Sequence, residues 1–162
     1  MASTRMALSI LIGIILSIFS IGAFTSWSSW YSNYAYFGTD LLKFFYVIFT
    51  DNFRFDIISF FTSDTMTIFN FFAPAMLSWL FVGFVCGAIV KGSKRGFEVG
   101  LLVVIVDLLL WILLGIIGGE DVFNQFIDTN LVTTLGGIIS AIAGAVIGGL
   151  LGGWASGPFE GM

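Results

Sequence analysis

One carboxyl group lies deep within an apolar stretch and is the first candidate for chemistry. Asp107 stands about ten residues into the run 97–119. An ionisable side chain at that depth is costly in lipid and is by default a functional candidate. All six Lys and Arg residues lie outside the apolar runs, so we expect Asp107 to be protonated and to donate a hydrogen bond. Candidate acceptors or donors at similar depth are Ser17, Ser140 and the indole of Trp111.

Three roles for Asp107 are open on the sequence alone. The first is a neutral structural hydrogen bond, which we favour. The others are a proton or cation site and a contact with a partner subunit.

The usual reactive constellations are missing from the sequence. The chain has no histidine and a single cysteine, Cys86, so the common zinc, haem and copper ligand sets and a Ser-His-Asp set cannot form. No glycine loop with Lys and Ser or Thr is present to bind phosphates. We therefore predict that the chain is not an enzyme and has no catalytic residue, no metal and no cofactor. Its net charge of -4, with six basic residues, also argues against a nucleic-acid partner.

The composition places the chain in a membrane. Of its 162 residues, 58% are hydrophobic and only 10% are charged, which leaves too little polar surface for a soluble domain. A transmembrane helix needs about 20 apolar residues. The sequence predicts an all-α, polytopic integral membrane protein, a single domain over 1–162 formed by a four-transmembrane-helix bundle. Its predicted spans are 6–24, 71–90, 97–119 and 131–154.

The first span also has features of a signal peptide, but its apolar run exceeds the usual length of about 7 to 15 residues. We therefore predict a retained helix. The start of the second span has two interpretations, because Pro74 suits the first turn of a helix but would kink a helix that began at Asp64.

Basic residues predict the orientation. Arg5 precedes the first span, and Lys91, Lys94 and Arg95 fill the short loop 91–96. Such residues favour the cytoplasmic side, so we expect both termini in the cytoplasm and the protein in the cell membrane. The opposite side then holds segment 25–70 and loop 120–130, with two bases, Lys43 and Arg54, against seven acids. These acids are Asp40, Asp51, Asp56, Asp64, Glu120, Asp121 and Asp128.

The segment 25–70 is the least ordinary part of the chain. It opens with aromatic residues of the kind found at the lipid headgroup level, which are Trp27, Trp30, Tyr31, Tyr34 and Tyr36. From Asp40 to Arg54 the charged residues, Lys43 among them, fall in one narrow helical sector, which indicates an extracytoplasmic amphipathic helix lying at the interface. Alternatively, the aromatic residues cover the protein's own helices rather than lipid.

Small residues recur every four positions in the fourth span. One row is Gly136, Ser140, Gly144, Gly148 and Gly152, and the adjacent row is Gly137, Ala141, Ala145, Gly149 and Gly153. This glycine-zipper pattern allows close approach of helix backbones in lipid. A shorter pair, Gly83 and Gly87, lies in the second span. The neighbours are either helices of this chain or those of another subunit.

Two functions follow as hypotheses. The first is a non-catalytic accessory subunit of a larger membrane assembly, with the lipid bilayer and other membrane subunits or copies of itself as partners. The alternative is a homo-oligomeric ion channel or proton-linked transporter that uses Asp107.

Overall fold

The computed structural model describes residues 2–63 and 66–158, and all regular structure within them is helical. Asp64, in the predicted interfacial segment, lies outside the described residues. The elements are α1 (Ala2–Phe24), α2 (Ser28–Phe37), α3 (Leu41–Asn52), α4 (Ile57–Thr62), α5 (Ile68–Phe71), α6 (Pro74–Val90), α7 (Ser93–Ile117), the short 3-10 helix η1 (Val122–Phe126) and α8 (Asp128–Ala155).

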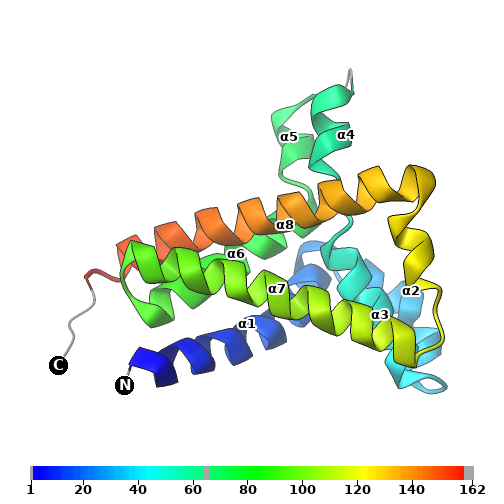
Figure 1. Ribbon diagram of the computed structural model, residues 1–162, viewed down its shortest axis with the longest axis horizontal. Coiled ribbons are helices and arrows are strands. Elements are labelled where there is room, and N and C mark those ends of the chain that lie inside the picture. The colour runs from blue at the N-terminus through cyan, green and yellow to red at the C-terminus, as the bar shows by residue number, and fades with distance from the viewer. Residues whose placement is uncertain (1, 64–65, 159–162) are drawn as a thin grey trace.

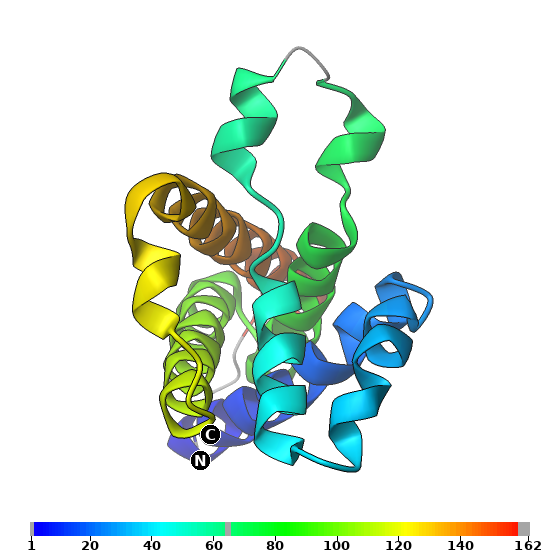
Figure 2. The same ribbon diagram turned by 90° about the vertical axis from the view of Figure 1, so that its right-hand side faces the viewer.

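Helices α1, α6, α7 and α8 form a bundle along the long axis of the molecule (Figure 1). The start of α1 and the end of α8 lie at one end of this bundle, together with the connection between α6 and α7 (Figure 1). The helices α2 and α3 lie at the opposite end (Figure 2). The basic residues Arg5, Lys91 and Lys94 therefore share the end that carries the termini.

Three of the described helices are long and apolar enough to cross a membrane, over Thr4–Phe24, Ser93–Ile117 and Asn130–Ala155. The fourth, α6, is apolar but has only 17 residues. It begins at Pro74, three residues after the predicted start of the span at residue 71, and the helix does not continue back toward residue 64. Proline suits this position because the first-turn N–H has no intrahelical acceptor.

The connection between α6 and α7 is tighter than the predicted loop 91–96. Helix α7 begins at Ser93, so only Lys91 and Gly92 join the two helices, with φ angles of 57° and 84°. The backbone N–H of Gly92 donates to the carbonyl of Gly153 at 2.9 Å. This bond ties the connection to the last turns of α8. The predicted loop 120–130 likewise contains η1 and the first residues of α8.

Helix α3 packs into the protein instead of resting its apolar side on lipid alone. Its buried residues include Phe44, Ile48, Phe49 and Asp51, and it contacts α1, α2, α6 and α7. Its inner face thus matches the interpretation in which aromatic residues of the segment cover the protein's own helices. Leu41 remains exposed.

The bundle core combines small or β-branched side chains with two tryptophans. Trp79 and Trp111 are fully buried, and the ring of Phe53 lies 5.7 Å from the first and 5.6 Å from the second. The segment that follows α3 is therefore fixed to α6 and α7 by aromatic contacts.

Candidate functional site: polar groups at the end of the bundle

A hollow of about 240 Å³ lies where α1, α3 and α6 meet. It contains an ion pair in which Arg54 Nη1 donates to Asp51 Oδ1 at 3.1 Å. Asp51 is only 6% exposed, whereas Arg54 is largely exposed. The lining residues are Ile21, Thr25, Ser29, Asp51, Arg54, Phe55, Ala73, Pro74 and Ala75.

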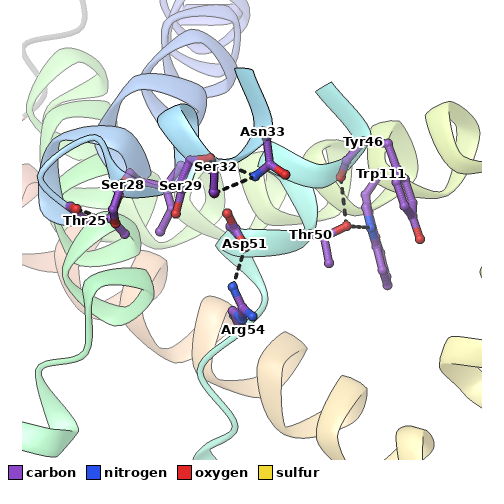
Figure 3. Close-up of polar contacts among 11 residues, drawn as sticks. Thr25, Ser28, Ser29, Ser32, Asn33, Tyr46, Thr50, Asp51, Arg54 and Trp111 are labelled. Carbon is purple, nitrogen blue, oxygen red and sulfur yellow. Dashed lines mark hydrogen bonds and ion pairs between the residues drawn. The ribbon is translucent and has the colours of Figure 1, made fainter. Parts of the chain in front are cut away.

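Local structure positions this pair. Asp51 lies in the last turn of α3, and Arg54 follows two residues after the end of that helix. Figure 3 shows Asp51 between Arg54 and the polar residues of α2, where Asn33 Nδ2 donates to the Ser29 carbonyl at 2.7 Å. A carboxylate this buried needs a charged partner, and Arg54 supplies it. The exposed guanidinium can also bind an outside anion, such as a lipid phosphate.

The predicted interfacial residue Lys43 makes a second ion pair. Its Nζ lies 2.7 Å from Glu120 Oε1 and 5.2 Å from the centre of the Tyr36 ring. The hydrogen bond to Glu120, followed by the attraction of its charge, raises the pKa of Lys43. Glu120 follows the C-terminal end of α7, so this pair joins α3 to the turn beyond α7.

The other predicted interfacial residues are the aromatic residues Trp27, which precedes α2, and Trp30, Tyr31 and Tyr34, which lie within it. Trp27 and Trp30 pack on Gly22 of α1, and Tyr31 and Tyr34 are exposed.

Asp107 is fully buried, with 0% exposure. Among the described residues neither of its carboxyl oxygens has a hydrogen-bond partner of standard geometry. Ser17 of α1 is close enough to interact with this carboxyl, but its hydroxyl donates to the Ile14 carbonyl at 2.8 Å. Of the predicted partners, Ser17 is therefore the one that interacts with Asp107.

The other two predicted partners of Asp107 are engaged elsewhere. Trp111 Nε1 donates to Thr50 Oγ1 of α3 at 2.8 Å (Figure 3). Ser140 Oγ donates to the carbonyl of Phe55 at 2.7 Å. Both side chains are turned toward the segment between α1 and α6. The prediction had paired residues only by their depth along the spans, so it did not include this segment.

The small residues of α8 meet backbone from this same chain. A Cβ atom added to Gly83 of α6 or to Gly100 of α7 would strike the carbonyl of Ala145. The row that begins at Gly136 faces Asp56 and then α6, where the Cβ atoms of Gly144, Gly148 and Gly152 would meet Trp79, Leu80 and Phe84. The sequence left open whether these small residues contact helices of this chain or of another subunit. For the contacts described here the neighbours belong to this chain and are α6, α7 and residues 53–56.

Sequence reasoning missed the burial of Asp51 and Asn52. Asn52 has 0% exposure, and neither polar atom of its side chain has a hydrogen-bond partner among the described residues. The spacing from Phe44 through Ile48 to residues 51 and 52 follows one helical face. That pattern could have predicted the burial of Asp51. It conflicted with the prediction that Asp51 belongs to the exposed charged face of residues 40–54.

Comparisons with protein-family models, with curated proteins and with solved structures gave no match to this chain.

Proposed function

We propose that this protein is a non-catalytic accessory subunit of a larger membrane assembly, in the cell membrane with both termini in the cytoplasm. The observation that carries the proposal is the hairpin of α4 and α5, which projects sideways from the bundle (Figures 1 and 2). The orientation is supported by Arg5, Lys91 and Lys94, which lie at the end that carries the termini.

The hairpin has an aromatic core of its own. The rings of Phe55, Phe60 and Phe71 contact one another, with centres 5.8 Å, 6.1 Å and 5.5 Å apart. Its two helices have only six and four residues. Isolated helices below about 12–15 residues are marginal in water, so these short helices depend on packing for stability.

The base of the hairpin is fixed to α8. The Asp56 carboxylate caps α4 by accepting from the backbone N–H groups of Ile58 at 2.9 Å and Ser59 at 3.1 Å. It lies against Gly136, where a Cβ atom would displace it. Together with the bond from Ser140 to the Phe55 carbonyl, these contacts give the projection a defined direction.

The outer surface of the hairpin is apolar and has no cover within the described chain. Phe69 is 87% exposed. The exposed apolar side chains are Phe61, Met66, Ile68, Phe69 and Phe72. Aromatic residues and methionine are enriched in interface cores. The rows of small residues on α8 are occupied internally, so we assign the contact with another membrane polypeptide to this hairpin.

The test is extraction of the full chain, carrying an affinity tag, from its source membrane in a mild detergent, followed by a native-gel mass measurement. The wild-type protein should migrate with other polypeptides. The double variant Ile68→Ala and Phe69→Ala should migrate as a monomer. Phe123→Ala is the matched control, because Phe123 is 74% exposed on η1 and should leave the complex intact. A lone wild-type monomer, or a complex that survives the double variant, would overturn the proposal.

The channel or transporter that uses Asp107 stays a sequence-based prediction. The complete burial of this side chain supplies no opening for an ion.

A further inference from the structure

A second hollow, of about 270 Å³, lies between α2 and the start of α3, and every residue that lines it is aromatic. Figure 2 shows these two helices beside each other at the end of the bundle. The lining residues are Trp27, Trp30, Tyr31, Tyr34, Phe37 and Phe44.

Three neighbouring pairs of these rings meet nearly at right angles, and the rings of Tyr34 and Phe37 stack at 6° with centres 6.3 Å apart. Trp27 and Trp30 meet at 88°, with centres 5.5 Å apart. Trp30 and Phe44 meet at 87° and 5.6 Å, and Phe37 and Phe44 meet at 84° and 5.4 Å. Phe44 is buried, whereas Tyr31 is 79% exposed. The hollow therefore has a floor fixed in the core and a rim open to the surroundings.

The fixed wall is held by α1. A Cβ atom on Gly22 would lie 2.7 Å from Trp30 Nε1 and 2.8 Å from Trp27 Cε3, so both rings rest on the bare backbone there. Phe19 stacks on Trp30 at 5.5 Å. The turn before α2 places Trp27 at a φ angle of 63°, which is uncommon for a residue with a side chain. The two tryptophans are thus positioned before any ligand binds.

The chemistry of this hollow favours a cation that has no hydrogen to donate. The faces of aromatic rings carry negative potential and attract cations within about 6 Å. No Lys or Arg lines the hollow. A primary ammonium needs oxygen acceptors for its three N–H groups, and among the lining side chains only the hydroxyl groups of Tyr31 and Tyr34 are oxygen acceptors, whereas a quaternary ammonium needs none. The same pair of helices already holds one cation over a ring, with Lys43 Nζ 5.2 Å from Tyr36.

The position of the hollow in the molecule indicates which kind of molecule carries that cation. Helix α1 ends at Phe24, and α2 starts four residues later. Helix α1 is long and apolar enough to cross a membrane. The end of such a helix lies at the headgroup level. A volume of about 270 Å³ is below the usual range of about 300–1,000 Å³ for drug-sized ligands and suits a headgroup. We propose that this aromatic hollow binds the trimethylammonium headgroup of a membrane lipid.

The first experiment measures headgroup preference. The full-length protein is placed in nanodiscs that contain equal amounts of a phosphatidylcholine and a phosphatidylethanolamine with the same acyl chains, and the retained lipids are counted by native mass spectrometry. The choline lipid should be enriched about tenfold. In Tyr31→Leu and Tyr34→Leu this enrichment should fall about tenfold, whereas Tyr31→Phe keeps the ring and should keep the preference. Trp154→Leu, at an exposed position near the end of α8, is the matched control and should change nothing.

The second experiment separates charge from shape. The fluorescence of the purified protein in a choline-free detergent is titrated with choline and with its neutral carbon isostere, in which a tert-butyl group replaces the trimethylammonium group. Choline should bind about tenfold more tightly. Equal binding of the two would overturn the proposal, because the hollow would then be an apolar groove. Binding of free choline without any lipid preference in nanodiscs would overturn the assignment to a lipid. These outcomes are independent of complex formation through the α4–α5 hairpin.

Discussion

Close contacts between helix backbones in the bundle predict the effect of a single added methyl group. At Gly149 of α8, the carbonyl oxygen lies against Gly87 of α6 and Gly96 of α7, and a Cβ atom at either glycine would strike it. We therefore choose Gly87→Ala as the perturbation. The added methyl group cannot be accommodated by rotating a side chain, because the obstacle is backbone. One helix has to move away from another.

Two opposing terms set the size of the effect. Alanine favours a helix over glycine by up to about 1 kcal/mol, so the substitution would stabilise the protein if the space were open. Overpacking a tight site typically costs about 1–3 kcal/mol. Gly149 is held on its other side by Gly96, so we expect a cost near the upper limit. The net loss of stability is then about 2 kcal/mol.

The assay is unfolding in mixed micelles of increasing SDS content, followed by the loss of helical circular dichroism. Gly38→Ala is the control, because Gly38 has no atom within 4 Å of the added position and a φ angle of -86°. Its effect should stay within about 0.5 kcal/mol. If Gly87→Ala is as stable as this control, the close approach of α6 and α8 does not contribute to stability, and the expected overpacking at the Gly149 carbonyl is refuted.

Two further predictions use the same unfolding assay. Trp111→Phe removes the donor to Thr50, which should cost about 1 kcal/mol, in addition to the packing that is lost with the buried indole. In a Thr50→Val background the total cost should be smaller by about the hydrogen-bond share, and an undiminished cost would show that the hydrogen bond does not contribute. The raised pKa of Lys43 implies that its pair with Glu120 stabilises the fold below the ordinary lysine value and is lost as the pH rises through the raised value. Lys43→Met should therefore lose less stability at alkaline pH than the wild-type protein. The alkaline loss of stability that the variant keeps includes the part due to Tyr46, whose pKa burial raises. Identical alkaline profiles would exclude this contribution of Lys43.

The long helices were predictable because apolar length is a local property. The predicted spans 6–24, 97–119 and 131–154 lie within α1, within α7 to two residues at its end, and within α8. The start of α6 was not predictable to the residue, because Pro74 is compatible both with a helix start and with a kink. In the structure a helix starts at Pro74, because residues 72–73 separate the end of α5 from the beginning of α6 in the bundle.

The interior of segment 25–70 shows where sequence reasoning reaches its limit. The charged sector predicted for residues 40–54 contains Asp40, Lys43, Asp51 and Arg54, and it predicted one polar face. Asp51 is instead buried, because a salt bridge to Arg54 lets a carboxylate enter the protein. A partner three residues away is visible in the sequence, but the helices that enclose the carboxylate come from distant parts of the chain.

Depth along a helix was equally insufficient to pair Asp107 with its neighbours. Residues at the same depth in a bundle meet only when their helices turn the right faces toward each other. Trp111 lies one turn beyond Asp107 on α7, yet its indole reaches Thr50 of α3. The indole N–H of Trp111 therefore donates to a residue outside the predicted spans, whereas the sequence had predicted a partner inside the four-helix bundle.

The distribution of contacts within the bundle also bears on where a partner can bind. Helix association in lipid relies on close backbone approach and on polar contacts, and this chain uses Gly83, Gly87, Gly96 and Gly100 for contacts among its own helices. A partner polypeptide therefore has to recognise a different kind of surface. Exposed side chains of the α4–α5 hairpin, such as Phe69, form a surface whose shape a protein partner can complement more closely than lipid tails can. This is why the proposal depends on the α4–α5 hairpin and not on the glycine pattern that dominates the sequence.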